Sequence, residues 1–364
     1  MVLDDFRHRG FLPPADPLRS FPDGSPYRLL DEVGEALPER LKRDDFRCWA
    51  EGLEIPCWET PDVAESFPEL CLYYVRLGFL ASGYVHQVGA PCARRLPSNI
   101  ALPLYAASQR LKRPPILSYD GYALYNWMRL DPSGPVALGN IDTIQNFVDL
   151  YDEHWFIAVH VEIEALAAEA LSALLDLAEE DAFADGDAVD AAIEVITKSL
   201  RRQIRVLRRI PEKMSPDRYF REFRPYICYF ENVVYEGVDQ APMSFRGETG
   251  AQSSVVPALV AFFKIPHAPS ALTNHLADMG NYMPSSHRAL VERIEQMPDV
   301  KGVASADQFN AALEALAEFR EVHYGWARIF IDQKVSDPRG TGGTPYMRWL
   351  DQLIDETRAH QIRS

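Results

Sequence analysis

The chain lacks the segments and the charge that several functional classes require. No apolar run reaches the length of a transmembrane helix, and the opening residues, MVLDDFRHRGF, lack the apolar core of a signal peptide. Basic residues are few, since 37 lysines and arginines stand against 53 acidic residues, a formal net charge of −16. Because basic surface supplies most of the affinity for nucleic acid and for anionic lipid, we expect no nucleic-acid partner and no membrane partner.

Cysteine pairs and phosphate-binding motifs are missing as well. The five cysteines are scattered, with no CxxC pair for zinc and no CxxCH motif, and free thiols are typical of a cytoplasmic protein. Two stretches rich in glycine and threonine, Gly247–Gly250 and Gly340–Thr344, lack the lysine of a P-loop. We interpret them either as ordinary connections or as loops that offer N–H groups and hydroxyls to a carboxylate or an ammonium group.

Helical periodicity dominates the chain after about residue 145. Earlier segments are short and rich in proline, whereas later ones carry alanine, leucine and glutamate at helical spacing. We therefore predict a mostly α-helical chain, with a small N-terminal α-rich domain over residues 1–145 and a large helical-bundle domain over residues 146–364. The predicted helices are Phe156–Glu180, Asp187–Ile210, one with Ser215 as N-cap and Pro216 at its first position, and Ser305–Ile331, while Gly237–Gly250 is predicted to be a loop.

One histidine lies on the apolar stripe of the last predicted helix. His323 follows Phe319 by four residues and precedes Trp326 by three, so its imidazole belongs to the buried face. A single inward imidazole in an apolar bundle is what five-coordinate haem iron requires, although a core histidine bound to a backbone carbonyl is the ordinary alternative. Arg320 lies one turn earlier on an adjoining face, where its guanidinium can meet a haem propionate or solvent.

A second cluster combines an arginine with aromatic rings. In YFREFRPY, Tyr219–Tyr226, Arg224 follows Phe220 by four residues, so the two share a helix face. A guanidinium among rings suits an aromatic amino acid, whose side chain stacks while its carboxylate binds the arginine. A structural ion pair at a helix interface is the alternative. No nucleophile elbow, carboxylate pair or Ser–His pair stands out beside these two clusters.

These stretches resemble the indoleamine 2,3-dioxygenase family, haem enzymes that open the indole ring of tryptophan. The resemblance extends from about Leu96 to the C-terminus, and its motifs occur in the family's order. They are LPSNIALP, PPILSY and NW within Leu96–Trp127, VEI at Val161–Ile163, FREFR at Phe220–Arg224, VYEG at Val234–Gly237, TGAQSS at Thr249–Ser254, YMPSSHR at Tyr282–Arg288, FREVH at Phe319–His323 and GTGGT at Gly340–Thr344.

The resemblance implies haem b as the cofactor and assigns roles to individual positions. His323 matches the proximal haem ligand, Arg320 the arginine that meets a propionate, and Arg224 the arginine that binds the substrate carboxylate. The implied pocket residues are Tyr219, Phe220, Tyr119, Tyr122, His154, Trp155 and Ala158, with Glu248, Thr249 and Gly250 in a loop over the haem face and Thr341 in a mobile loop that closes on the substrate.

Several of these positions depart from the vertebrate members of the family. His154 and Trp155 replace two phenylalanines, and Ala158 replaces a distal serine. Glu248 replaces a glycine and Tyr122 a cysteine. Ala158 leaves no hydroxyl near the oxygen site, which fits a mechanism without a distal base, whereas His154 adds an ionisable group near the pocket and bears on the identity of the substrate.

The resemblance implies oxidation of L-tryptophan, or a related indoleamine, by ferrous haem and O₂ to N-formylkynurenine. No protein acid or base is required, and an electron donor is needed to keep the haem ferrous. One alternative is a related haem monooxygenase acting on an indole- or tyrosine-type substrate, which His154 and Tyr122 favour. The other is a haem-binding sensor or carrier without turnover, which needs neither Arg224 nor the GTGGT loop.

Overall fold

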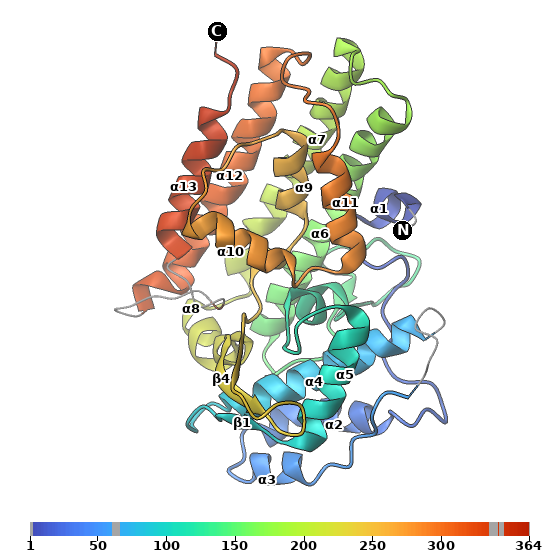
Figure 1. Cartoon of the computed structure of the whole chain (residues 1–364), viewed down its shortest axis with the longest axis vertical. Coiled ribbons are helices and arrows are strands. Elements are labelled where there is room, and N and C mark those ends of the chain that lie inside the picture. The colour runs from blue at the N-terminus through green and yellow to red at the C-terminus, as the bar shows by residue number, and fades with distance from the viewer. Residues whose placement is uncertain (1–2, 60–65, 335–340, 342–345, 364) are drawn as a thin grey trace.

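The computed structural model describes residues 3–59, 66–334, 341 and 346–363 (Figure 1), and helices make up most of them, which confirms the prediction of a mostly α-helical chain. The α-helices are α1 (Leu3–Arg9), α2 (Leu29–Arg40), α3 (Phe46–Glu51), α4 (Phe67–His86), α5 (Ser98–Leu111), α6 (Tyr151–Glu179), α7 (Gly186–Leu207), α8 (Pro216–Arg218), α9 (Val255–Phe262), α10 (Ala271–Gly280), α11 (Ser285–Glu295), α12 (Ala306–Phe330) and α13 (Tyr346–Ala359). The strands are β1 (Arg95–Leu96), β2 (Met128–Arg129), β3 (Ile141–Asp142), β4 (Phe230–Tyr235) and β5 (Met243–Phe245). Within the described ranges, no helix is both long and apolar enough to cross a bilayer.

The long helices lie side by side in one half of the molecule. Helix α7 packs against α6 and α12, and α13 covers the other side of α12, whereas α2 to α5 gather in the opposite half (Figure 1). Strand β4 pairs parallel with β1 and antiparallel with β5, so a small sheet joins early and late parts of the chain. The division into domains of residues 1–145 and 146–364 stays a prediction, because β1 from the first part pairs with β4 from the second.

The boundaries of the long helices follow from capping groups. Helix α12 begins after Ser305, whose hydroxyl accepts a hydrogen bond from the Gln308 N–H, as predicted. Helix α7 is capped by Asp185, and its basic residues gather toward the C-terminal end. Helix α6 starts five residues earlier than predicted, because the acidic residues Asp152 and Glu153 occupy its first turn, where the helix dipole favours negative charge.

Two predictions for the segment between residues 215 and 250 were wrong in part. Ser215 occupies the N-cap position but its side chain makes no capping bond, and only one α-turn follows. The chain then forms a π-turn, η3 (Tyr219–Phe223), and a 3₁₀ turn, η4 (Arg224–Ile227), because Pro225 has no N–H to continue an α-helix. Within the predicted loop, Met243–Phe245 forms strand β5, since β4 supplies an edge for it to pair with.

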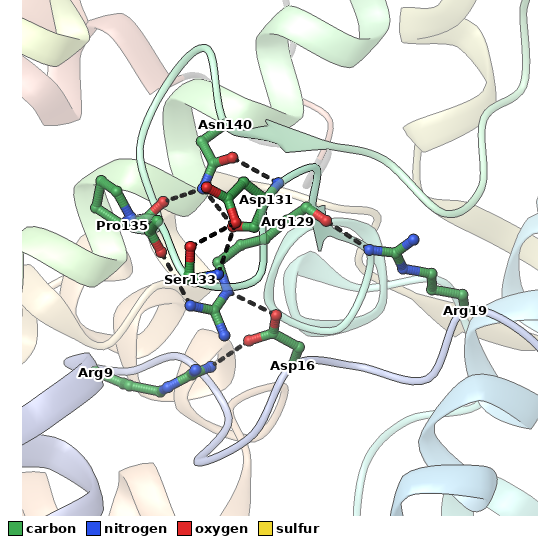
Figure 2. A network of polar contacts seen from close by, with 9 residues as sticks. Arg9, Asp16, Arg19, Arg129, Asp131, Ser133, Pro135 and Asn140 are labelled. Atoms are coloured by element: carbon green, nitrogen blue, oxygen red, sulfur yellow. Dashed lines mark hydrogen bonds and ion pairs between the residues drawn. The ribbon is translucent and has the colours of Figure 1, made fainter.

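The N-terminal segment is fixed against α6 and against the turn between β2 and β3. The Asp16 carboxylate binds both Arg9 and Arg129 at 2.8 Å, and Arg129 also donates to the Gly134 carbonyl at 3.0 Å (Figure 2). Beside this network, Gly10 adopts a φ of +62°, and a Cβ atom at this position would lie 2.0 Å from the Glu164 carbonyl oxygen of α6. Only glycine lets the two backbones approach this closely.

We predict that Gly10→Ala destabilises the protein more than Gly24→Ala does. Both glycines have positive φ, so both substitutions incur the cost of about 1–2 kcal/mol for a left-handed alanine. Only at Gly10 does the new methyl group also collide with backbone, which adds roughly 1–3 kcal/mol, because a Cβ at Gly24 would have no atom within 4 Å. Urea unfolding of the two variants measures the difference, and equal losses of unfolding free energy would contradict the close approach.

Candidate active site

One face of helix α6 carries two fully buried carboxylates. Glu153 and Glu164 each have no exposed surface, and they are three helical turns apart, so they point to the same side of the helix. Phe156 and His160 lie between them at spacings of three and four residues. These four residues form a stripe, which we call the α6 stripe, and it faces the segment that carries Tyr119 and Tyr122.

Glu164 joins three parts of the chain. Its carboxylate accepts hydrogen bonds from the Tyr119 hydroxyl at 2.8 Å and from the Ser253 hydroxyl at 2.5 Å. Gln252 adds a second connection, because its amide oxygen accepts from the Tyr119 N–H at 2.8 Å while its amide nitrogen donates to the Gly247 carbonyl at 2.9 Å. Burial raises the pKa of Glu164 to about 7, against the effect of the Ser253 and Tyr119 hydrogen bonds.

Glu153 holds the second inner tyrosine in the same way. It accepts hydrogen bonds from the Tyr122 hydroxyl at 3.1 Å and from the N–H groups of Phe147 and Val148 at 3.0 and 2.9 Å. The Tyr122 ring is stacked with those of Phe79 and Phe147, with centroids 5.6 and 6.3 Å away. Burial also raises the pKa of Glu153 to about 7. The two buried carboxylates therefore fix both tyrosine rings.

Phe156 is the centre of an aromatic wall built from three segments. Its ring centroid lies 4.5 Å from that of His160, 5.5 Å from Tyr219 and 6.3 Å from Tyr122. Phe223 adds a further ring at 6.0 Å. Such tilted rings pack into an apolar wall against which another aromatic group can pack.

Arg224 lies beside this wall, in contact with Phe220 as predicted. Its guanidinium carbon is 5.4 Å from the Phe220 ring centroid. The Arg224 charge also acts on the Tyr219 hydroxyl, whose pKa burial raises and Arg224 lowers. A cation beside an aromatic ring is able to receive the carboxylate of an aromatic ligand. The role of Arg224 in binding that carboxylate stays a prediction.

His323 keeps an accessible side chain although protein surrounds it. Burial, and then the charge of His160, lower the pKa of His323 to about 4, so the imidazole is neutral at neutral pH. Its side chain nevertheless keeps exposed surface, which places it in a recess of the molecule. A neutral imidazole that opens into a recess is a residue that would hold haem iron.

His160 has a defined tautomer and was not found by sequence reasoning. Its Nδ1 lies 2.7 Å from the Phe156 carbonyl oxygen, so this nitrogen carries the proton and donates. The Nε2 atom is then a hydrogen-bond acceptor, and burial lowers the pKa of the ring. His160 lies within electrostatic reach of His323, so the α6 stripe and the predicted haem ligand border the same region.

Arg320 is buried and connects two helices. Its Nη1 donates to the Leu353 carbonyl at 2.8 Å and to the Thr357 hydroxyl, so it ties α12 to α13. Burial lowers its pKa to about 10, although Glu356 opposes the shift. Its contact with a haem propionate stays a prediction.

Three predicted pocket residues of α6 do not lie on the α6 stripe. His154 contacts Asp142 at 2.6 Å, and hydrogen bonding to Asp142 raises its pKa despite the opposing effect of burial. The Trp155 Nε1 donates to the Arg209 carbonyl at 3.0 Å, and Ala158 is buried in the core of the N-terminal half. Their roles in binding substrate stay predictions, and the structure brings Phe156 and His160 to the aromatic wall instead.

The loop over the predicted haem face contains both buried and open positions. Glu248 is 3% exposed, whereas a Cβ on Gly250 would have no atom within 4 Å. The Thr249 hydroxyl accepts from the Ala251 N–H and begins the 3₁₀ turn η5 (Gly250–Gln252). Thr341 is buried, and the other residues of Gly340–Thr344 lie outside the described residues.

The fold and the site define an α-helical protein with an aromatic pocket beside a neutral, recessed histidine. A family model described as indoleamine 2,3-dioxygenase matches residues 4–335, and the chain belongs to this family, which confirms the resemblance. It is 29% identical to human indoleamine 2,3-dioxygenase 2, over 96% of this chain and 92% of the relative. It is 26% identical to a 6-hydroxytryptophan 2,3-dioxygenase from Fusarium equiseti, over 95% and 94% of the two chains, and 24% identical to a myoglobin from Haliotis madaka, over 92% of each.

We predict that Glu164 makes stability fall as pH rises. Its folded-state pKa lies above the ordinary 4.5, so its contribution is fully present below pH 4.5 and is lost as pH rises through about 7. Glu164→Gln keeps an acceptor for Tyr119 and removes this pH dependence. The dependence amounts to up to about 3 kcal/mol in the free energy of unfolding. Urea unfolding from pH 4.5 to pH 8 measures this dependence, and Glu180→Gln, at an exposed glutamate, is the control. If the free energy of unfolding of Glu164→Gln falls with pH as steeply as that of the wild type, Glu164 is not the group responsible.

Proposed function

We propose that the protein is a haem-dependent dioxygenase that cleaves the indole C2–C3 bond of L-tryptophan, or of a related indoleamine, with O₂ to give an N-formylkynurenine. The observation that carries the proposal is the neutral His323 imidazole, which opens into a recess beside an aromatic wall and an arginine. Family membership supports the same reaction. One relative is named for 6-hydroxytryptophan, so ring-hydroxylated tryptophans are candidate substrates as well.

His323 would hold the iron of haem b, and Arg320 lies one turn earlier on the same helix. Bound ferrous haem supplies the activation of O₂ and its addition to the indole. Both oxygen atoms enter the product as the C2–C3 bond breaks, so turnover consumes no external electrons. An electron donor is needed only to return oxidised haem to the ferrous state.

The contribution of the protein is to bind and orient the substrate. Arg224 binds the carboxylate, and the rings of Tyr219, Phe220 and Phe156 position the indole. Glu153 and Glu164 do not act as acid or base in this proposal, because each is already occupied by a tyrosine hydroxyl. His160 keeps its proton on Nδ1 and offers Nε2 to the ligand as a hydrogen-bond acceptor.

Two other functions remain to be tested against this one. A haem monooxygenase would add one oxygen atom to the substrate where a dioxygenase adds two, so the mass of the product separates them. A haem carrier, as the name of the Haliotis relative suggests for that protein, would bind O₂ without turnover. Anaerobic reduction followed by O₂ and L-tryptophan tests all three, and the absorbance of N-formylkynurenine is the expected result.

We predict that His323→Ala abolishes the Soret band of the purified protein, because the substitution removes the imidazole that would hold the iron. His8→Ala, at an exposed histidine, is the control and should keep the band. Haem content by the pyridine haemochrome assay measures the loss. Normal haem content in the His323→Ala protein would refute the ligand assignment.

We predict that Arg224→Ala raises KM for tryptophan by about 10–100-fold while the haem spectrum stays unchanged. Removal of a charged hydrogen-bonding partner costs about 1.5–3 kcal/mol of binding. Arg221→Ala, at an exposed arginine of the preceding turn η3, is the matched control. Steady-state kinetics measures the effect, and a KM within twofold of the wild-type value would rule out this role.

A further inference from the structure

The His160 imidazole presents a hydrogen-bond acceptor in the middle of the α6 stripe. Its Nδ1 lies 2.7 Å from the Phe156 carbonyl oxygen, which can only accept, so Nδ1 carries the proton and Nε2 carries the lone pair. Burial lowers the pKa of the ring, so the ring is neutral at neutral pH. Nε2 makes no hydrogen bond with a described residue and keeps accessible surface. The acceptor is therefore available to a ligand.

Open space adjoins this part of α6 where the helix meets the aromatic wall. The side chains of Phe156 and His160 keep part of their surface exposed, whereas residues 157–159 between them and Val161 are buried. The Phe156 ring centroid lies 4.5 Å from that of His160 and 5.5 Å from that of Tyr219. An aromatic ligand that packs against the wall at Phe156 therefore comes within reach of the His160 ring.

Two rings and one carbonyl group hold the imidazole in this orientation. Besides the Phe156 ring, the Tyr119 ring meets the imidazole edge-on, with centroids 6.0 Å apart. Tyr119 lies just before η1 (Asp120–Leu124) and is itself fixed, because its hydroxyl binds Glu164 and its N–H binds Gln252. Turning the imidazole over would forfeit the bond from Nδ1 to the carbonyl group. The direction of the Nε2 lone pair is therefore set before a ligand binds.

The tautomer of His160 decides which group of a ligand it binds. A lone pair repels a carboxylate and attracts an N–H group, and tryptophan carries both an α-ammonium group and a ring N–H. The ammonium group shares its carbon with the carboxylate, which the proposed function assigns to Arg224, beside Phe220. The wall runs from Tyr219 in η3, the turn before Arg224, through Phe156 to His160. An indole that extends along this wall from Arg224 brings its ring N–H toward His160.

We infer that His160 accepts a hydrogen bond from the indole N–H at Nε2, and that it thereby orients the ring and selects substrates whose ring carries a free N–H. The inference rests on the proposed function, since Arg224 must hold the other end of the amino acid. A ring with oxygen or sulfur in place of the N–H would leave Nε2 facing a second acceptor inside the complex, which lowers affinity. His160 takes up no proton in this role.

Binding to the ferric haem protein tests this inference without turnover. L-Tryptophan and β-(3-benzothienyl)-L-alanine, in which sulfur replaces the ring N–H, are titrated into the wild type, His160→Leu and His160→Gln, and the shift of the Soret band gives Kd. The wild type should bind tryptophan about tenfold more tightly than the sulfur analogue. His160→Leu, which removes the acceptor, should bind the two ligands equally. His160→Gln, whose amide oxygen is able to accept the same hydrogen bond, should retain the preference.

Equal affinities for the two ligands in the wild type, or a preference of the same size in His160→Leu, would overturn the inference. Indole-3-propionate, which lacks the ammonium group, is titrated as well. If His160→Leu abolishes the preference for tryptophan over indole-3-propionate and keeps the preference over the sulfur analogue, His160 binds the ammonium group and the inference is overturned. His8→Leu, at an exposed histidine, is the matched control and should keep both preferences of the wild type.

The outcomes separate this inference from the proposed function. If tryptophan binds and is converted without any preference over the sulfur analogue, only the inference fails. If none of the ligands perturbs the Soret band, the proposed function fails and the inference with it. Haem content and thermal unfolding confirm that each variant is folded. The comparison of the two ligands in the wild type needs no variant, so it decides against the inference even where His160→Leu loses its haem.

Discussion

The hydrogen bonds to the buried Glu164 carboxyl are the interaction on which the site depends. They bring together helix α6, the segment before η1 and the loop before α9, three parts of the chain that are distant in sequence. Gly10 packs directly against the backbone carbonyl of Glu164, so the N-terminal segment also lies against this residue. A buried carboxyl is costly unless it is hydrogen-bonded, and the arrangement that pairs Glu164 Oε1 with two hydroxyl groups is the one that forms the pocket.

The consequence is a rigid inner wall built from polar and aromatic groups together. Tyr119 and Tyr122 each have their hydroxyl bound to a carboxyl of α6, which holds the Tyr119 ring beside His160 and the Tyr122 ring beside Phe156. Because Glu153 and Glu164 are raised in pKa by burial, the wall carries less negative charge at neutral pH than its composition suggests. The binding surface for an aromatic ligand is therefore preorganised, which reduces the conformational entropy that the protein loses on binding.

The sequence was informative where one helix decides the geometry. The apolar stripe from Phe319 to Trp326 predicted that His323 belongs to helix α12. The spacing of Phe220 and Arg224 predicted their contact, even though the chain there is not one continuous α-helix. For α6 the family motif located the helix but not the side of it that lines the pocket. The two glutamates three turns apart in an apolar helix were the available signal, because such residues must find partners on one common side.

The three buried glutamates around the pocket differ in one respect that burial alone does not show. Glu153 is satisfied by the Tyr122 hydroxyl and by N–H groups of its own chain. Glu164 accepts from Tyr119 and Ser253 through Oε1, whereas its buried Oε2 has no partner among the described residues. Glu248 is 3% exposed, and no hydrogen bond from a described residue reaches its side chain. Folding alone gains nothing from an unsatisfied carboxyl, since an apolar residue of similar size would be less costly there. The difference in partners, more than the difference in burial, therefore distinguishes Glu153, whose oxygens are both used by its own chain, from Glu164 and Glu248.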